Sequence, residues 1–288
     1  MRRFQLEEPR SMQEALQILV DREDSKPIAG GTALLILIKQ GLYVPKTLVN
    51  LKKIKNASDI TYDAERGLRV GALTTIHDLE TSPVVCEHYP TLANACHVVA
   101  NIRIRNMATI GGNLAHADYQ SDPPAVLVAL DSKVELSSSK GIRQASLEEF
   151  LVGSYETKLE PTELLTALLV PPSPQGVRGT YIKFTTRSSE DRPCAGIAAL
   201  ALMKNGICES IRLVVGAVSQ TPIRIRKAEE LARAEKLNDQ LIEKIALEAA
   251  RAVEPIEDLH GPADYKRRIV EVLTGRALGA LVTEGVRV

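Results

Sequence analysis

Two glycine pairs are the residues whose type and spacing point most directly to ligand chemistry. They lie in the segments AGGT (Ala29–Thr32) and TIGGN (Thr109–Asn113), each between apolar stretches. Glycine lets the backbone turn with positive φ and approach a ligand closely, and consecutive N–H groups in such a turn can bind an anion. Two turns of this kind, with threonine hydroxyls and an asparagine amide beside them, could hold a pyrophosphate between them.

The residues alone also allow a plainer interpretation. Either glycine pair fits a simple tight turn, and neither belongs to a P-loop or to a G-x-G-x-x-G fingerprint. The sequence has no Ser-His-Asp pattern, no HExxH motif and no carboxylate pair suited to acid–base work. Its four cysteines lack CxxC spacing, so we expect reduced thiols and no metal site in this chain. Without further context, the sequence indicates an α/β protein that could bind phosphate.

Charged residues near the second segment allow more than one role. Arg103 and Arg105 would neutralise phosphates, bind a partner subunit, or simply be solvated charges. We expect His116 to be a structural loop histidine rather than a catalytic one. We expect the 187–192 stretch, which contains two arginines and two acidic residues, to form a salt-bridged surface loop of modest energy.

The spacing of apolar residues and the positions of capping residues predict the elements that position the first glycine pair. Ser11 and Glu14 fit a capping box ahead of an apolar helical face. The sequence then predicts a strand at 27–29, a helix at 33–40 with Thr32 as N-cap and Gly41 as its C′ residue, and a strand at 47–51. Around the second pair, a helix is predicted from 90 to 100, and the segment 110–114 fits no regular element.

The second half of the chain begins after its clearest boundary, the stretch 171–179 with three prolines and two glycines. The pair Asn205-Gly206, between two apolar runs, predicts a β-hairpin. Helical patterns follow at 226–235, 240–253 and 264–281. The C-terminal region is therefore expected to be an antiparallel sheet followed by helices.

The composition argues against two classes of protein, nucleic-acid binders and membrane-spanning proteins. The chain has 288 residues, and Lys+Arg and Asp+Glu both total 36, so it lacks the basic surplus of a nucleic-acid binder. Aromatic residues make up only 3%, which argues against base-stacking platforms. No apolar run approaches the roughly 20 residues of a membrane span, and the N-terminus lacks the apolar core of a signal peptide. We expect a cytoplasmic protein with no transmembrane segment.

Longer segments carry a specific resemblance. The segments PIAGGTALL (27–35) and ATIGGNLAHADYQSDPPAVLVALD (108–131) resemble the FAD-binding medium subunit of molybdenum hydroxylases, the xanthine dehydrogenase and carbon monoxide dehydrogenase family. The similarity continues over essentially the whole chain, through SMQEALQIL, ELLTALLVP, YIKF, RSSEDRPCAGIA and LVVGAV. It implies an α+β fold with a two-subdomain FAD-binding domain of the PCMH/VAO type and a C-terminal domain with an antiparallel sheet and helices. The implied boundaries are 1–175, with subdomains at about 1–53 and 54–175, and 176–288 for the CO-dehydrogenase-flavoprotein-like domain.

The resemblance also implies which residues bind the cofactor. The first loop would wrap the FAD pyrophosphate, and the second would contact the phosphates near the flavin. An aspartate nine residues after TIGGN would contact the adenosine portion, and two later residues would contact the flavin. The expected cofactor-binding residues are Ile28, Ala29, Gly30, Gly31, Thr32, Ala33, Leu34, Leu35, Thr109, Ile110, Gly111, Gly112, Asn113, Asp122, Leu165 and Lys183. No residue of this chain is expected to be catalytic or to bind metal.

The activity implied by the resemblance is that of an oxidoreductase subunit. Electrons would start at a molybdenum-pterin centre on a large subunit and reach this chain from [2Fe–2S] clusters on a small subunit. They would leave through FAD to NAD, a quinone, O₂ or another acceptor. The expected assembly is a dimer of heterotrimers, and the isolated chain would not act on substrate.

Two other functions remain open from the sequence. One is a stand-alone, single-chain FAD-dependent oxidase or reductase, which would need its own catalytic base. The other is a structural subunit that has lost its flavin. Two positions depart from the family pattern, since relatives commonly carry Asp or Ser where Ala33 stands and often Ala where Pro193 stands. Ala33 bears on the strength of FAD binding, and Pro193 on the choice of acceptor.

Overall fold

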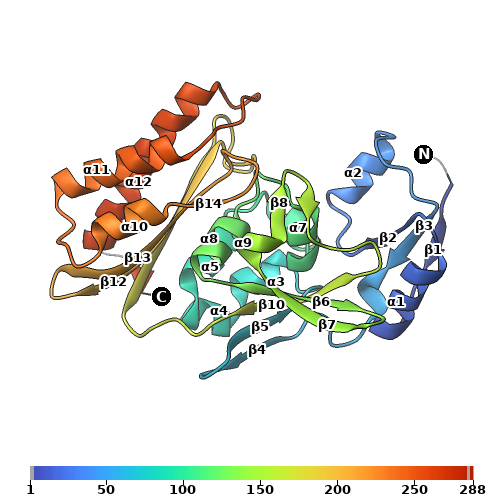
Figure 1. The fold of residues 1–288 in the computed structure, drawn as a ribbon. Helices are drawn as coiled ribbons and strands as arrows, with labels where there is room; N and C mark the ends of the chain where they lie inside the picture. Colours follow the sequence, from blue (N-terminus) through green and yellow to red (C-terminus); the bar gives the residue numbers. More distant parts are fainter. Residues whose placement is uncertain (1–2, 284–285, 288) are drawn as a thin grey trace.

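The computed structural model describes residues 3–283 and 286–287. Three sheet-based units follow one another along the chain (Figure 1). A small blue unit carries the N-terminus, a larger unit lies in the middle, and a long sheet covered by the orange and red helices lies at the far end. No helix among the described residues combines the length and apolar character that crossing a membrane requires.

The N-terminal unit is a parallel sheet with helices packed on it. Its strands are β1 (Gln5–Glu7), β2 (Ser25–Ile28) and β3 (Thr47–Asn50), in the order β1-β3-β2. Its helices are α1 (Met12–Asp21), α2 (Leu34–Lys39) and the 3-10 turn η1 (Leu51–Lys53). Ser11 caps α1 by accepting a hydrogen bond from the Glu14 amide at 3.1 Å. The predicted capping box is only half formed, because the Glu14 carboxylate accepts from the Arg10 amide and not from the Ser11 amide. The buried face of α1 then packs on Val49 of β3.

The middle unit pairs an antiparallel sheet with a group of short helices. The sheet order is β4 (Ile60–Asp63), β5 (Gly67–Gly71), β10 (Leu164–Val170), β6 (Lys133–Ser138) and β7 (Gly141–Ser146). The helices are α3 (Ile76–Thr81), α4 (Pro83–His88), α5 (Pro90–His97), α6 (Ile102–Arg105), α7 (Ile110–His116), α8 (Pro123–Ala129) and α9 (Leu147–Phe150). A two-stranded ribbon of β8 (Leu151–Gly153) and β9 (Glu156–Thr157) follows α9. Tyr89 and Phe150 are the largest side chains in its core.

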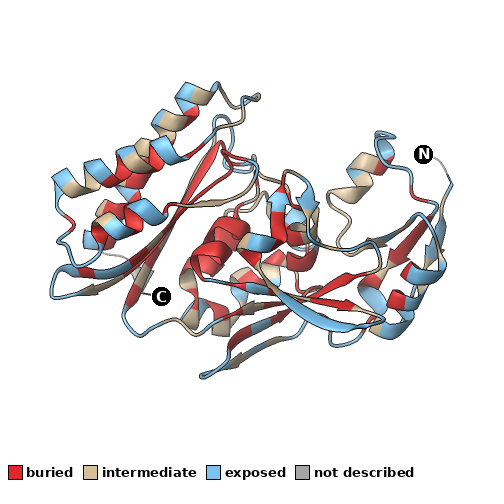
Figure 2. Cartoon of the chain, viewed as in Figure 1, coloured by how far each residue is buried: buried red, intermediate tan, exposed pale blue. Residues whose placement is uncertain are grey.

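The C-terminal unit is an antiparallel sheet that is buried on both faces. Its order is β14 (Ile223–Arg224), β13 (Ile207–Gly216), β12 (Ala195–Lys204), β11 (Val177–Phe184) and β15 (Val286–Arg287). Residues such as Ile197 face a core shared with helices α10 (Arg226–Ala232), α11 (Asp239–Ala252) and α12 (Ala263–Thr283). The alternate residues, such as Ala198 and Leu200, join the core of the middle unit instead. This explains why β12 reads as a continuous apolar run and appears red in Figure 2.

Several sequence predictions for this half of the chain are confirmed. Asn205 (φ 51°) and Gly206 (φ 80°) form the tight turn between β12 and β13. The three predicted C-terminal helices are present with ends shifted by a few residues. The α+β class of the fold is confirmed as well.

Two local predictions are wrong. Thr32 does not cap α2: the cap position is Ala33, already helical in backbone conformation and without a side-chain hydrogen bond. The segment expected to be irregular, 110–114, lies in α7, where the Thr109 hydroxyl caps the helix by accepting from the Gly112 amide at 3.1 Å. The two glycines are tolerated in this helix because its first turn lies directly against Ala72, where a side chain on Gly111 has no room.

Candidate functional site

The two glycine segments, 80 residues apart in the sequence, lie against each other. A Cβ on Gly30 would overlap the Met107 carbonyl oxygen and would lie 3.0 Å from the Ala108 Cα. A Cβ on Gly112 would lie 4.0 Å from the Ala29 Cβ. Only glycine at position 30 allows this approach, because any larger residue would push the N-terminal unit away from the middle unit. The pair therefore forms a junction between two units.

The first segment presents backbone amides to its surroundings. Gly31 has φ +77°, a conformation that favours glycine, and its carbonyl accepts from the Leu35 amide at 3.1 Å. The amides from Gly30 to Ala33 donate to no acceptor among the described residues. The whole stretch 28–35 is half-buried. Successive N–H groups without protein partners, held on a glycine turn, are suited to a bound anion.

The second segment contributes differently, because the protein itself uses four of its five amides, those of Ile110–Asn113. Ile110 and Gly111 donate to the carbonyls of Thr74 and Ala72, both at 2.9 Å. Gly112 donates to the Thr109 hydroxyl oxygen, and Asn113 to the Thr109 carbonyl. The donors that remain for a ligand are the Thr109 amide, the Thr109 hydroxyl and the Asn113 side-chain nitrogen, none of which donates to an acceptor among the described residues. An anion nest therefore forms in only one of the two segments.

Asp122 and Lys183, both predicted to contact the cofactor, form a buried ion pair with each other. The Lys183 ammonium lies 3.1 Å from Asp122 Oδ2, and both side chains are less than a tenth exposed. Tyr181 donates to the other carboxylate oxygen at 2.8 Å, and Lys183 also donates to the Val98 carbonyl at 2.7 Å. Burial raises the pKa of Asp122 to about 6, while Lys183 and Tyr181 oppose that rise. The pair joins the start of α8 to β11.

Leu165 lies in β10, at a point where the pairing with β6 shifts register. Its side chain is buried in the core of the middle unit. The next residue, Thr166, accepts from the Ala72 amide, and Ala72 in turn packs on Gly111. The neighbour of Leu165 in β10 is thus linked to the second glycine segment through Ala72, the residue that follows β5.

The short loop after α7 carries charged groups that order it. Asp118 accepts from the Arg192 guanidinium at 2.9 Å and from the Tyr155 hydroxyl at 3.4 Å. His116 ends α7 with its ring 5.1 Å from the Tyr155 ring, and burial lowers its pKa. His116 is thus the last residue of a helix and not a loop residue, and its structural role stays a prediction. The predicted salt-bridged surface loop is also present, with Arg187 3.8 Å from Asp191.

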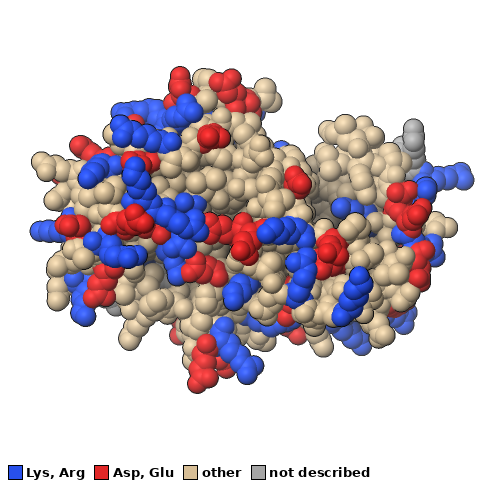
Figure 3. Space-filling model, viewed as in Figure 1, with Lys and Arg blue, Asp and Glu red and all other residues tan. Residues whose placement is uncertain are grey.

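Arg105 and Arg103, which precede the second segment, have different environments. Arg105 is buried and donates to Glu80 at 2.7 Å and to the Val99 carbonyl at 3.1 Å. It therefore stabilises the turn around α6 and is not available to a phosphate. Arg103 remains exposed. Lys, Arg, Asp and Glu side chains are intermixed on the face drawn in Figure 3, in line with the zero net charge.

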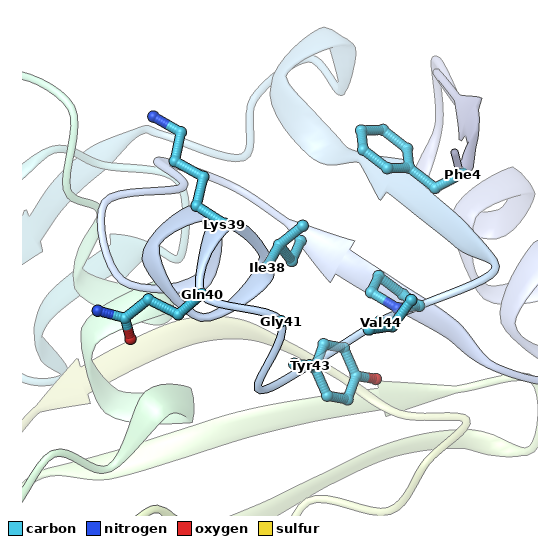
Figure 4. Close-up of a pocket in the computed structure, with 8 residues that line it drawn as sticks. Phe4, Ile38, Lys39, Gln40, Gly41, Tyr43 and Val44 are labelled. Carbon is cyan, nitrogen blue, oxygen red and sulfur yellow. The ribbon is translucent and has the colours of Figure 1, made fainter. Parts of the chain in front are cut away.

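Two surface pockets lie away from the predicted residues. One, of about 310 Å³, lies between Phe4 and the stretch Ile38–Pro45 that follows the first turn of α2 (Figure 4). The other, of about 450 Å³, lies between the N-terminal unit and the sheet of the middle unit, near Arg10, Arg69 and Glu135. Neither is lined by a residue predicted to bind cofactor.

Sequence reasoning missed two partners of the site. Tyr181 could have been found, because a strand places residues i and i+2 on one face and Tyr181 therefore shares a face with Lys183. Ser121, which donates to Asn113 Oδ1 at 2.9 Å, carries no signal in the sequence. All four cysteines are free, and no group of metal-ligating side chains gathers in the part of the chain that the structure describes.

Comparison with known proteins matches both halves of the chain to family models. Residues 2–173 match the "FAD binding domain in molybdopterin dehydrogenase", and residues 180–281 match the "CO dehydrogenase flavoprotein C-terminal domain". The chain is 32% identical to the glyceraldehyde dehydrogenase medium chain of Sulfolobus acidocaldarius, over 93% of this chain and 94% of that one. It is also 32% identical to the carbon monoxide dehydrogenase medium chain of Afipia carboxidovorans, over 96% and 95%.

A solved structure agrees with these matches. The carbon monoxide dehydrogenase of Hydrogenophaga pseudoflava contains a chain that superposes with a TM-score of 0.95 at 31% identity. The similarity covers 99% of both chains.

Proposed function

This chain belongs to the family of FAD-binding medium subunits of molybdenum hydroxylases, and from that premise we propose that its two glycine segments hold the FAD pyrophosphate between them. The observation that carries the proposal is the run of amides from Gly30 to Ala33, which find no acceptor among the described residues although the turn that holds them is well defined. A pyrophosphate has several acceptor oxygens. Amide N–H groups that point at it would gain hydrogen-bond acceptors, and the phosphate oxygens would gain donors.

The second segment would bind the same group through side chains. Thr109 and Asn113 have a hydroxyl and an amide nitrogen suited to phosphate oxygens. Ala33 offers no such group, so this chain would rely on the backbone where relatives commonly have a polar side chain. The contact with Met107 and Ala108 would keep the two sets of donors at a fixed separation.

We assign the remaining predicted residues to the rest of the cofactor. Asp122 already accepts from Tyr181 and Lys183, but each carboxylate oxygen can accept a second hydrogen bond. Lys183 would hold that carboxylate in place, and Leu165 would line the apolar side of the site. The proposed division of the chain is a FAD-binding domain up to residue 175 and a C-terminal domain from 176 to 288.

The chain's role in catalysis would be to bind and orient its cofactor. FAD, when bound, supplies chemistry that accepts and releases one or two electrons. The residues of this chain would fix its position, exclude water and leave one edge accessible. The proposed place of the subunit is between the [2Fe–2S] clusters of a small subunit and an external acceptor such as NAD, a quinone or O₂. A large molybdenum-pterin subunit would oxidise the substrate, and the assembly would be a dimer of heterotrimers.

Absorbance of the purified full-length chain tests this function. We expect flavin bands, or stoichiometric uptake of added FAD with quenching of its fluorescence. We also expect no oxidation of aldehydes, purines or CO with an artificial electron acceptor until the partner subunits are present. A chain that takes up no FAD would contradict the cofactor assignment. A chain that oxidises one of these substrates without its partners would contradict the division of labour and support a stand-alone enzyme.

A further inference from the structure

The loop between α7 and α8 contacts the C-terminal unit at several points, and two of its side chains converge there on one carboxylate, that of Asp258. Tyr119 donates to Asp258 Oδ2 at 2.8 Å, and Gln120 donates to the same oxygen at 3.1 Å. Asp258 lies 138 residues further along the chain, in the turn that precedes α12. The turn itself is tied by the His260 amide, which donates to Asp258 Oδ1 at 2.8 Å. Asp258 is therefore fully engaged by groups from both units.

A fully buried lysine holds this carboxylate. Lys266, in the first turn of α12, is 0% exposed, and its ammonium lies 2.7 Å from Asp258 Oδ2 and 2.8 Å from the Ile256 carbonyl oxygen. Burial alone would raise the pKa of Asp258, but Lys266, the His260 amide and Tyr119 together lower it, so the carboxylate stays ionised. Because an ion pair with a buried partner often contributes less to stability than apolar residues of similar size, we interpret this pair as one that fixes geometry.

The loop fixed in this way leads directly to the proposed cofactor site. Ser121, next to Gln120, donates to Asn113 Oδ1 at 2.9 Å and so orients the side-chain amide of the second glycine segment. The following residue, Asp122, starts α8 and pairs with Lys183. A displacement of Tyr119 and Gln120 would therefore move Asn113 and Asp122 as well.

We infer that Asp258 and Lys266 are positioning residues of the flavin site. They hold Tyr119 and Gln120, and through this loop they set the orientation of Asn113. The inference rests on the proposed function, because it requires that Asn113 binds the cofactor. It gives the turn ahead of α12 a part in cofactor binding, although Asp258 and Lys266 reach the site only through the loop.

Tyr119→Phe tests the inference, because it removes one hydrogen bond to Asp258 and leaves the Asp258–Lys266 pair intact. We expect the dissociation constant for FAD, measured on the full-length chain by fluorescence quenching, to rise about tenfold. We also expect the visible absorbance bands of the bound flavin to shift. The melting temperature of the FAD-free chain should fall no further than in the control variant.

Ser219→Ala is the matched control. Ser219 is buried and donates to the Glu254 carbonyl at 3.1 Å, so the variant also removes one hydroxyl hydrogen bond to the segment ahead of α12. It touches nothing in the loop between α7 and α8, and FAD affinity should stay within about twofold of wild type. The double variant Asp258→Asn/Lys266→Met should weaken FAD binding at least as much as Tyr119→Phe, and Lys266→Arg should retain most of the affinity.

The possible results distinguish failure of this positioning role from failure of the proposed FAD site. Unchanged FAD affinity in Tyr119→Phe, or a loss equal to that of Ser219→Ala, would overturn the positioning role alone. If wild type takes up no FAD, or if Gly30→Ala binds it normally, the proposed site itself fails and the inference fails with it.

Discussion

The contact between the two glycine segments makes Gly30→Ala the most informative substitution in the chain. A Cβ at this position would lie 2.8 Å from the Met107 carbonyl carbon and 3.0 Å from the Ala108 Cα, and it would overlap the Met107 oxygen. Ordinary contacts between carbon atoms are about 3.5–4.0 Å. The obstacle is backbone on both sides, so no side chain can turn away to make room. The N-terminal and middle units must separate locally by about 1 Å.

This displacement sets the size of the expected effects. Overpacking of a well-packed contact costs about 1–3 kcal/mol of unfolding free energy. In a protein of this size, that corresponds to a fall of roughly 2–10 °C in melting temperature. Cofactor binding should suffer more, because donors on two units must meet one pyrophosphate and a misplacement of about 1 Å can cost on the order of 100-fold. We expect a rise of about 10- to 100-fold in the dissociation constant for FAD.

The assay is titration of the FAD-free chain with FAD, followed by fluorescence quenching, with thermal melting measured on the same samples. Gly279→Ala is the control, because a Cβ there meets nothing within 4 Å and alanine favours the α12 helix by about 1 kcal/mol. It should raise the melting temperature slightly and leave FAD affinity unchanged. If Gly30→Ala binds FAD as tightly as wild type and melts within about 1 °C of it, the two segments do not form a tight junction and the reasoning is wrong.

Three further predictions follow from other parts of the molecule. Burial raises the pKa of Asp122 above its ordinary value, so ionising this carboxyl in the folded protein lowers the free energy of unfolding. Wild type should therefore lose stability relative to Asp122→Asn as pH rises from about 4 through 6. If urea denaturation gives the same difference in unfolding free energy between the two proteins across that range, this prediction is wrong. Gly206→Ala should lower stability by about 1–2 kcal/mol through its φ of +80° alone, and a change in FAD affinity would refute a purely local effect. Among the cysteines, only Cys86 is exposed, so one thiol should react with a disulfide reagent in the native chain and four after denaturation; fast reaction of Cys194 or any other buried thiol would contradict the packing.

Local signals in the sequence predicted much of the fold because each depends on near neighbours. The cap at Ser11, the Asn205-Gly206 turn and the strand β3 require only side-chain periodicity and the conformational freedom of a few residues. The α7 helix was missed for the same reason. Two consecutive glycines argue against a helix locally, and what permits it is the close approach of Ala72 from another part of the chain.

The sequence by itself determined the family and the two glycine segments, and it predicted a list of cofactor-binding residues. It could not tell which of these residues meet the ligand through backbone and which are engaged by protein. Tertiary structure decided that the first segment has a run of open amides, while those of Ile110–Asn113 in the second are used internally. It also paired Asp122 with Lys183, 61 residues apart, and placed a buried lysine behind the loop that leads to them. The physical reason is that hydrogen-bond partners and desolvation depend on which groups the fold brings together, and sequence spacing does not specify these.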